Sequence, residues 1–242
     1  MKSMITAITP TGDRPLAFEL CQQWMANQTR QPDQWLVIDD GKVAMELEQP
    51  LPMMQYVRRE PQIDDPKHTL ILNMQIALPL ITGNKVIVIE DDDYYAPSYI
   101  EEMSNRLDQH EIVGIMRAKY YHLPSGGYFQ CDNTTHASLA ETGFRVSVTP
   151  EFSEIWDGNG GSSLLDFRLW HKVGRARGLL FIDIDNPLYL SIKGLPGRTG
   201  IGGGHTSDFY GSTNKDTADR AILRKWVPRD HQTYLNVIEN MK

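Results

Sequence analysis

The sequence has few features of a membrane protein, a disulfide-stabilised protein or a protein that binds polyanions. Its two cysteines, Cys21 and Cys131, lie in no motif, which excludes a zinc site built on cysteine pairs and gives no support to a disulfide framework. The net charge of −7 leaves no basic field for polyanions. The most apolar stretch, 70–81, is shorter than the roughly 20 residues of a membrane helix and contains Pro79. No apolar signal-peptide core follows the first residues. We therefore expect a soluble, cytoplasmic protein.

Two common nucleotide-binding fingerprints are also absent. The glycine-rich segment 194–204 has His205 where a dinucleotide fingerprint needs glycine, and it does not follow the first predicted strand. A phosphate-binding loop is excluded because no Lys-Ser or Lys-Thr pair follows a matching glycine run. Any nucleotide site in this chain must therefore be built in another way.

What the sequence does contain is a regular alternation over its first hundred residues. Short β-branched runs at 5–9, 35–38 and 85–89 predict buried strands, and apolar stripes over 16–27 and 69–81 predict helices. Another helix is expected just after Pro97. This order is typical of an α/β fold with a doubly wound, mainly parallel sheet flanked by helices.

The second half of the chain is less regular. Apolar runs predict strands at 112–116, 144–148 and 179–182, and a stripe with aromatic anchors predicts a helix over 163–174. The remainder, from Asp216, is mostly helical with a break at a proline. No repeat or low-complexity linker divides the sequence, so we expect one domain over residues 1–242.

Four consecutive carboxylates, Glu90-Asp91-Asp92-Asp93, follow the strand predicted at 85–89. Like charges this close raise one another's pKa unless a cation neutralises them. Mg²⁺ and Mn²⁺ prefer oxygen ligands and commonly share one or two carboxylates with substrate phosphates. The alternative without a metal is a solvated acidic turn that caps the next helix. The position at the carboxyl end of a buried strand, where α/β sheets bind ligands, favours a metal site.

Three segments together resemble a known family. They are 5–10, 37–41 and 83–97, and they match a strand-loop, a pair of aspartates on the second strand, and a strand that ends in a DxD-type acid motif. In this order and spacing they resemble the family 2 glycosyltransferases of the GT-A fold. The resemblance implies inverting transfer of a single sugar from a nucleotide-diphosphate donor, most commonly a UDP-sugar, to a hydroxyl acceptor. It implies Mn²⁺ or Mg²⁺ as the cofactor.

The same resemblance implies a division of the chain and a role for each matching residue. Residues 1–95 would form the nucleotide-sugar-binding half, 96–205 the acceptor half, and 206–242 a C-terminal helical tail. Asp92 would be the main metal ligand, and Glu90, which stands where the family has aspartate, would help the metal or contact the ribose. The nucleotide-binding residues would be Thr9, Thr11, Asp13, Arg14, Asp39, Asp40 and Asp91.

Inverting transfer needs a carboxylate that takes the proton of the attacking hydroxyl. In the family this base commonly opens a helix in the second half, and 164–170 resembles that segment, which implies Asp166 as the base. As an ordinary helix residue, Asp166 would instead pair with Arg168 or Lys172. Asp157 is the reserve candidate.

Other polar residues have more open assignments. Some enzymes of the GT-A fold use a C-terminal histidine as a further metal ligand, which implies His205. Lys193 and Arg198 either meet phosphate oxygens or face solvent. The family's Arg-Asn pair on the helix before the acid run is missing here, and Lys67 and His68 are the candidate substitutes.

Two other functions remain open, and the acceptor is undefined. A sugar-phosphate nucleotidyltransferase has a related fold, although its glycine-rich opening loop is absent. A non-catalytic nucleotide-sugar-binding module would keep the acid run without needing Asp166. The acceptor could be a glycan, a lipid-linked saccharide, a protein side chain or a modified DNA base. Tyr120, Tyr121, Tyr128 and Phe129 either stack on it or pack within the protein. The Gln-x-x-Arg-Trp motif of processive synthases is absent, which favours single-sugar transfer.

Overall fold

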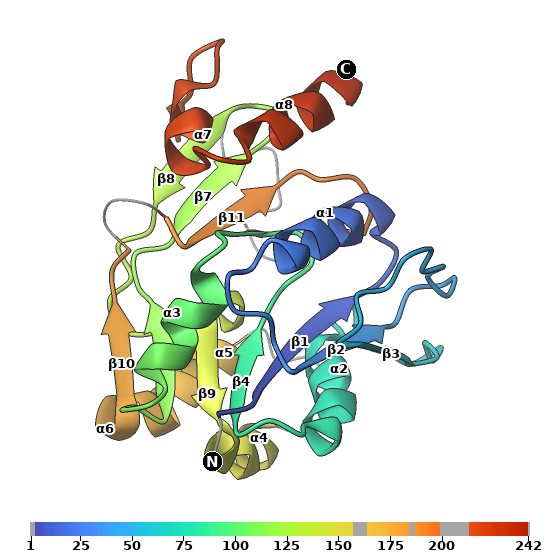
Figure 1. Cartoon of the computed structure of the whole chain (residues 1–242), viewed down its shortest axis with the longest axis vertical. Coiled ribbons are helices and arrows are strands. Elements are labelled where there is room, and N and C mark those ends of the chain that lie inside the picture. Colours follow the sequence, from blue (N-terminus) through green and yellow to red (C-terminus); the bar gives the residue numbers. More distant parts are fainter. Residues whose placement is uncertain (1–2, 157–163, 184–186, 199–212, 242) are drawn as a thin grey trace.

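The alternating apolar runs form a seven-stranded sheet in the computed structural model, which describes residues 3–156, 164–183, 187–198 and 213–241 (Figure 1). The strand order is β10-β6-β9-β4-β1-β2-β3. Among these strands, β9 alone runs antiparallel to its neighbours, β4 and β6. The strands are β1 (Ile5–Thr11), β2 (Gln34–Asp39), β3 (Met54–Arg58), β4 (Lys85–Val88), β6 (Ile112–Ile115), β9 (Thr142–Arg145) and β10 (Gly178–Phe181). The mainly parallel sheet predicted from the sequence is therefore confirmed.

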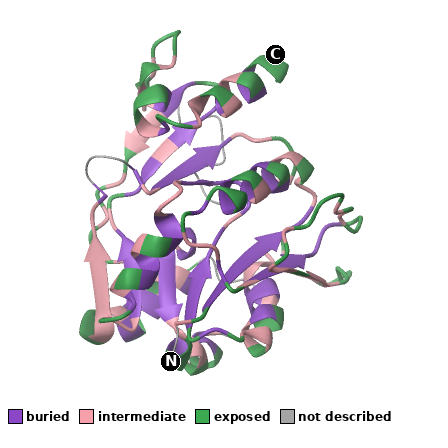
Figure 2. Ribbon diagram, in the orientation of Figure 1, coloured by how far each residue is buried: buried purple, intermediate pink, exposed green. Residues whose placement is uncertain are grey.

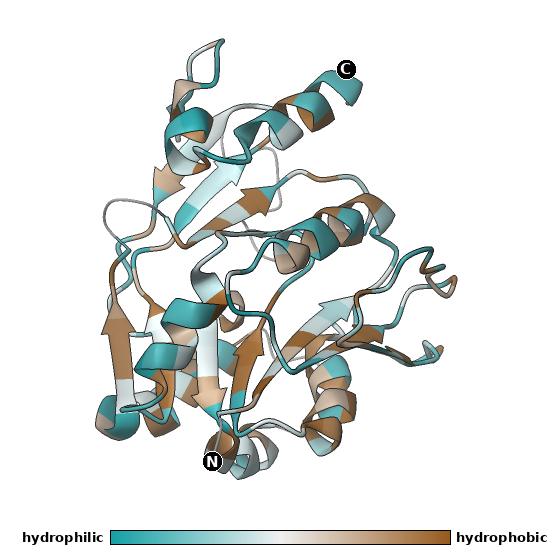
Figure 3. Cartoon of the chain, in the orientation of Figure 1, coloured by the Kyte–Doolittle hydropathy of each residue, from teal (hydrophilic) through white to brown (hydrophobic). Residues whose placement is uncertain are grey.

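Helices cover both faces of this sheet, and successive residues of the central strands alternate between the two faces. Ile87 packs in the cluster that contains α1 (Pro15–Ala26) and α3 (Tyr99–Arg106). Its neighbours Val86 and Val88 pack in the opposite cluster, with α2 (Leu70–Ala77), α4 (Thr149–Ile155) and α5 (Leu165–Leu169). Because both faces are covered, the strand needs apolar residues at every position. Figures 2 and 3 show the central strands as buried and β4 and β10 as hydrophobic.

A second, five-stranded sheet lies beside the first and was not predicted. Its order is β12-β8-β7-β11-β5, with β11 parallel to β7 and antiparallel to β5. The strands are β5 (Tyr94–Tyr95), β7 (Lys119–His122), β8 (Gly127–Gln130), β11 (Tyr189–Lys193) and β12 (Asn214–Lys215). Since β4 belongs to the first sheet and β5 to the second, the acid run at 90–93 is the connection between the two sheets (Figure 1).

The C-terminal region packs against the second sheet and α1. It contains α7 (Ala221–Trp226) and α8 (His231–Asn240), separated at Pro228 as the sequence predicts. Tyr234 of α8 lies 5.6 Å, ring centroid to ring centroid, from Trp24 of α1, and Trp24 lies 5.1 Å from Tyr94 of β5. One apolar cluster therefore joins α1, both sheets and the tail. The division into a nucleotide half, an acceptor half and a tail stays a prediction.

Several predicted elements differ from the observed ones in their bounds. The segment 69–81, expected to be one helix, forms α2 and then a 3₁₀ turn at Leu78–Leu80. The α-helix stops there because Pro79 has no N–H for the α-helical ladder. The strand expected at 144–148 is β9, followed by the 3₁₀ turn Val146–Val148. After α5, the helix expected over 163–174 continues as the π-helical turn Trp170–Gly174 and α6 (Arg175–Arg177). No helix in the described ranges is both long and apolar enough to cross a membrane.

Candidate active site

The acid run begins two residues after the end of β4 and is largely withdrawn from solvent. Ile89 still donates its backbone N–H to Ile8 on β1 at 2.9 Å, so the run starts where the parallel sheet ends. Asp91 and Asp93 are each 1% exposed and Asp92 is 7% exposed, while Glu90 is half-buried. A solvated acidic turn would leave these carboxylates in water. Burying them without partners is costly, and the surrounding residues must therefore compensate the charge.

Arg14 provides one compensating charge, from the loop that follows β1. Its Nη1 lies 3.1 Å from Asp91 Oδ1 and 2.7 Å from Asp92 Oδ2. Thr11 Oγ1 donates to Asp91 Oδ2 at 2.6 Å. Burial alone would lower the pKa of Arg14, but Asp91 and Asp92 raise it above its ordinary value. The first loop is therefore tied to Asp91 and Asp92.

Lys193 at the end of β11 provides the second charge. Its Nζ lies 3.3 Å from Asp93 Oδ1, which also accepts the backbone N–H of Ile192 at 2.9 Å. Asp93 Oδ2 accepts a hydrogen bond from the Tyr189 hydroxyl. Burial would lower the pKa of Lys193, but the carboxylates of the acid run raise it above its ordinary value. Lys193 is only 6% exposed, so the alternative that it faces solvent is wrong.

The side chains of Glu90, Asp92 and Asp93 converge. One oxygen of each lies within 4.8 Å of the others, a spacing at which they could hold a single cation. Burial, with Asp93 and Asp92, raises the pKa of Glu90 to about 8, and burial raises the pKa of Asp91 to about 6 against the opposing charge of Arg14. The structure brings together Glu90 and Asp92, two of the three predicted metal ligands, and adds Asp93. The third, His205, lies outside the described residues.

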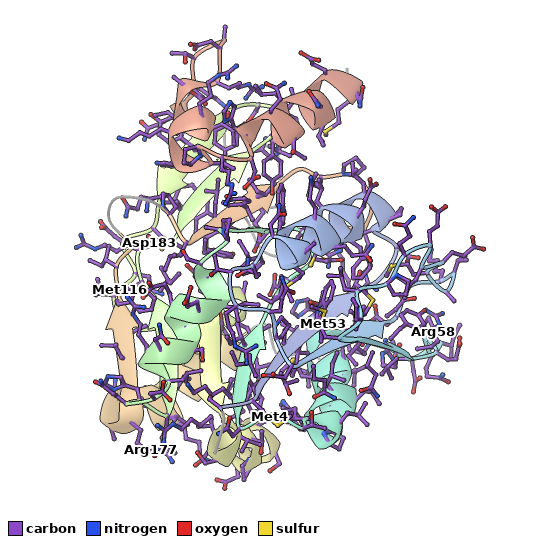
Figure 4. All side chains as sticks on the ribbon, viewed as in Figure 1. Met4, Met53, Arg58, Met116, Arg177 and Asp183 are labelled. Carbon is purple, nitrogen blue, oxygen red and sulfur yellow. The ribbon has the colours of Figure 1, made fainter. Side chains whose placement is uncertain are left out.

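The aspartate pair at the end of β2 divides into two roles. Asp39 accepts hydrogen bonds from the Tyr56 hydroxyl at 2.7 Å and from the backbone N–H groups of Gly41 at 2.8 Å and Met45 at 3.0 Å. Arg58, labelled in Figure 4 on the β3 side of the molecule, has Nη1 3.2 Å from Asp39 Oδ2. These contacts occupy Asp39 in holding the loop after β2.

Asp40 instead joins three segments. Arg59 Nη2 lies 2.9 Å from Asp40 Oδ2, and Arg198 Nη2 lies 2.5 Å from Asp40 Oδ1. Burial would raise the pKa of Asp40, but the Thr69 and Arg59 hydrogen bonds and the charge of Arg198 hold it below its ordinary value. Arg198 thus contacts a predicted nucleotide-binding residue.

The loop after β1 passes so close to the loop after β2 that position 12 requires glycine. A Cβ at Gly12 would lie 2.4 Å from Asp40 Oδ1 and 2.7 Å from the Gly41 nitrogen. Asp13 receives the backbone N–H of Lys42 on Oδ1 at 2.8 Å. Thr9 is fully buried and accepts a hydrogen bond from Trp35 Nε1 at 2.8 Å, so it supports this loop from the core side. Nucleotide contacts by Thr9, Thr11 and Asp13 stay predictions.

A cavity of about 380 Å³ lies among β6, β7, the segment after β8 and the first turn of α5. Asp166, the predicted base, lines it, and its Oδ1 accepts the backbone N–H of Phe167 at 2.7 Å. Burial raises the pKa of Asp166, against the Phe167 hydrogen bond and the charge of His136. Lys172, offered above as a partner of Asp166, lies 3.3 Å from Glu151 instead. The cavity is lined by Ile115, Arg117, Ala118, Tyr120, Cys131, Asn133, His136, Ser138, Glu141 and Asp166.

Glu141 is a site residue that the sequence argument did not identify. It is 2% exposed and lines the cavity that Asp166 also lines. Its Oε2 accepts hydrogen bonds from Ser138 Oγ at 2.8 Å and from the Ser138 backbone N–H at 3.3 Å. Burial raises the pKa of Glu141 to about 8. The one sequence signal was the Ser-x-x-Glu pattern, which indicates a capping box and carries no functional meaning by itself.

A hydrogen-bonded chain links the acid run to the cavity. The backbone N–H of Glu90 donates to the Tyr95 hydroxyl at 2.8 Å, and that hydroxyl donates to the Ala140 carbonyl oxygen at 3.1 Å. Ala140 directly precedes Glu141. Tyr120 lines the cavity, and burial raises its pKa. The charge of Glu141 adds to this rise and the charge of Lys193 opposes it. The acid run and the cavity are therefore neighbouring parts of one site.

His68 is half-buried and is influenced by charges of both the first loop and the cavity. Burial lowers its pKa, as do the charges of Arg198 and Arg14, while Asp166 opposes them. Its buried Nδ1 has no hydrogen-bond partner within the described residues. His205 and Asp157 lie outside the described residues, so their predicted roles stay predictions.

Comparison with known proteins gives a match in structure only. No protein-family model matches the chain, and no curated protein matches it in sequence. TarS 1–349 of S. aureus in complex with UDP-GlcNAc matches with a TM-score of 0.55 at 13% identity, over 98% of this chain and 71% of that protein. The mannosyltransferase PcManGT of Pyrobaculum calidifontis, in complex with GDP-Man and Mn²⁺, matches with a TM-score of 0.56 at 12% identity, over 81% and 58% of the two chains.

These likenesses establish the fold of the chain as that of the GT-A-type glycosyltransferases. The chain spans 60% of TarS 1–349 in one match and 36% of a longer TarS structure. A nucleotidyl transferase from Methanothermobacter matches with a TM-score of 0.47 at 14% identity, a likeness too weak to carry an argument. At these identities the shared property is the fold, and the activity must be argued from the site.

Proposed function

We propose that this chain is a divalent-metal-dependent glycosyltransferase that moves a single sugar, with inversion, from a nucleotide-diphosphate donor to a hydroxyl acceptor. The observation that carries the proposal is the convergence of Glu90, Asp92 and Asp93 at the carboxyl end of β4 in a GT-A-type fold. In an open α/β sheet this end is where ligands bind.

The charge balance of the acid run supports a divalent cation. With all four carboxylates ionised, as metal binding would require, the acid run and the two cations that pair with it in the described residues, Arg14 and Lys193, carry a formal charge of −2. A buried site with that charge favours Mg²⁺ or Mn²⁺, whose preferred ligands are oxygens. PcManGT, which shares the fold, was solved with Mn²⁺ and GDP-Man. Glu90, Asp92 and Asp93 would hold the metal, which would neutralise charge on the leaving diphosphate.

The loops beside the acid run would bind the donor nucleotide. Arg14 follows β1, and Asp40 follows β2, so both lie at the same edge of the sheet as Asp92. Arg14, which contacts the acid run, would meet phosphate oxygens, and Asp40 and Arg198 would meet the ribose or the base. TarS was solved with UDP-GlcNAc, which supports a UDP-sugar as the first donor to test.

Asp166 would act as the base. Its carboxylate lines the cavity beside the acid run, where an acceptor hydroxyl would meet the donor sugar. The acceptor oxygen would attack the anomeric carbon opposite the leaving diphosphate, so the bond to the diphosphate breaks as the new glycosidic bond forms. Asp166 would take the proton of the attacking hydroxyl. Burial raises its pKa towards the pH at which it must accept a proton.

Calorimetry with nucleotides tests the proposal directly. UDP, GDP and ADP are titrated into the protein with Mn²⁺, with Mg²⁺ and with a chelator. We expect one nucleotide to bind at least about tenfold more tightly with metal, because a cation held by Glu90, Asp92 and Asp93 would neutralise charge on the diphosphate. No metal-assisted uptake of any of the three would contradict the proposal. Uptake without sugar transfer would favour a binding module, and release of pyrophosphate from sugar-1-phosphate and NTP would favour a nucleotidyltransferase.

A further inference from the structure

Glu141 lines the same cavity as the predicted base, and only one of its two carboxyl oxygens has a hydrogen-bond partner in the described part of the chain. Its Oε2 forms the capping box with Ser138, accepting the serine hydroxyl at 2.8 Å. Its Oε1 is buried and has no hydrogen-bond partner within the described residues. A buried polar atom without a partner costs roughly 1–3 kcal/mol, so such an atom in a native fold needs a reason. The capping box explains Oε2 only.

The cavity gives a reason for the Glu141 Oε1 atom that has no partner among the described residues. Glu141 and Asp166 both line it, and its volume of about 380 Å³ lies within the range of small-molecule sites, roughly 300–1,000 Å³. The backbone beside Glu141 is held to the acid run through Tyr95. Glu141 is therefore positioned relative to the predicted metal site by structure that does not involve its own side chain.

The lining of the cavity indicates the kind of molecule that fits. Tyr120 is held flat against Phe129, with centroids 4.5 Å apart and an interplanar angle of 5°, so its ring has a fixed orientation. Asn133 and His136 add polar groups to the lining, and Asn133 Nδ2 donates to the His136 carbonyl oxygen at 2.9 Å. An aromatic face with several convergent hydrogen-bonding groups suits a ring that carries hydroxyls. Arg117 lines the cavity together with the carboxyl groups of Glu141 and Asp166, and burial raises the pKa of Glu141 to about 8, so the lining has little net charge and suits an uncharged ring.

We infer that Glu141 is an acceptor-binding residue, whose Oε1 holds a ring hydroxyl of an uncharged saccharide placed against Tyr120 with its reacting hydroxyl at Asp166. This inference rests on the proposed function and names the acceptor class for it. Of the acceptor classes left open by the sequence, this inference selects the saccharides, as a glycan or a lipid-linked saccharide, over a protein side chain or a modified DNA base.

Saccharide binding without any nucleotide tests the inference separately from donor chemistry. The probes are methyl β-glucoside, methyl β-galactoside, methyl α-mannoside and N-acetylglucosamine, with glucose 6-phosphate as the anionic arm, each titrated against the full chain by saturation-transfer NMR. The variants are Glu141→Leu, Glu141→Gln and Ser138→Ala. Ser138→Ala removes the capping hydroxyl and leaves Oε1, so it controls for a merely structural role. Calorimetry with UDP, GDP and ADP, each with Mg²⁺, reports on the donor side of each protein.

We expect at least one uncharged saccharide to bind, with a dissociation constant raised about tenfold or more by Glu141→Leu. Glu141→Gln and Ser138→Ala should change it less than about threefold, because both keep a polar atom at Oε1. Nucleotide binding should be unchanged in all three variants. The inference is overturned if no uncharged saccharide binds, if the phosphorylated sugar binds in preference, or if Ser138→Ala weakens binding as much as Glu141→Leu. Loss of nucleotide uptake in the wild type, with saccharide binding intact, would contradict the proposed function alone.

Discussion

Lys193 and Asp93 stand one hundred residues apart in the chain, and Lys193 Nζ lies 3.3 Å from Asp93 Oδ1. This pair connects the end of β11 in the second sheet to the acid run that follows β4 in the first. Both side chains are almost fully buried. Asp93, the last carboxylate of the acid run, is therefore held by protein contacts, and one of its oxygens lies within 4.8 Å of an oxygen of Glu90 and of Asp92. Four predictions follow from this arrangement and from the neighbouring cavity.

Lys193→Met should destabilise the fold strongly. Removing one partner of a buried ion pair leaves the other charge buried without compensation, at a cost of about 3–5 kcal/mol. Urea unfolding in the presence of a chelator measures this cost. Lys172→Met is the matched control, because Lys172 pairs with glutamates at the surface, where such pairs contribute about 0–1 kcal/mol. Equal, small effects in both variants would show that the buried pair is not needed for stability.

Asp92→Asn should strongly weaken metal-assisted nucleotide binding with little loss of stability. The substitution removes one anionic ligand of the predicted metal site but keeps the size of the side chain. We expect the metal-dependent part of nucleotide affinity to fall about a hundredfold. Calorimetry with Mn²⁺ measures the loss, and Asp64→Asn, at an exposed position, is the control. If Asp92→Asn binds nucleotide and metal like the wild type, the metal site lies elsewhere.

Asp166→Asn should slow sugar transfer and spare donor binding. The amide cannot accept the proton of the attacking hydroxyl, and general base catalysis contributes about 10²–10⁴-fold. The measurement compares kcat for transfer to the best saccharide acceptor with nucleotide affinity in the same variant. Glu154→Gln, an exposed acid on α4, should leave both unchanged. A variant that loses donor affinity together with kcat would place Asp166 in the donor site.

Glu141 should make stability depend on pH. Its pKa is about 8 in the folded chain and 4.5 ordinarily, so between these values the folded state keeps a proton that the unfolded state has lost. The free energy of unfolding therefore falls as the pH rises through this window, by up to about 1.4 kcal/mol per pH unit. Glu141→Gln removes this dependence.

Urea unfolding of wild type and Glu141→Gln at pH 5, 6 and 7 measures the effect. The difference in unfolding free energy between variant and wild type should grow in favour of the variant as the pH rises. Glu90 and Asp91 also have raised pKa values, but they are present in both proteins and cancel in the difference. Parallel pH profiles for the two proteins would show that Glu141 titrates at its ordinary pKa.

The first half of the fold was predictable because its signals are local. The strands β1, β2 and β4 are buried on both faces, so each reads as a continuous apolar run, and the helices between them carry their own stripes. A parallel sheet then places the ends of these strands at one edge. The first loop, the aspartate pair and the acid run consequently met where the sequence argument expected them.

The second sheet and the cavity were not predictable in this way. The strands β5 and β11 of the second sheet have two and five residues. Their pairing joins segments that lie about a hundred residues apart. A short strand carries too little pattern to be recognised, and no local rule states which distant strand it will pair with. Lys193 read equally well as a surface residue, and nothing in the sequence marked Glu141 as a site residue.

The sequence by itself determined the parallel α/β core and the place of the acid run within it, because hydrophobic periodicity and strand order are properties of neighbouring residues. Only the tertiary structure decided which cations compensate the buried carboxylates, and that Glu141 shares a cavity with Asp166. Those relationships depend on contacts between distant segments. Burial then determines the charge, the hydrogen bonding and the pKa of each group, and burial is settled only when the chain has packed.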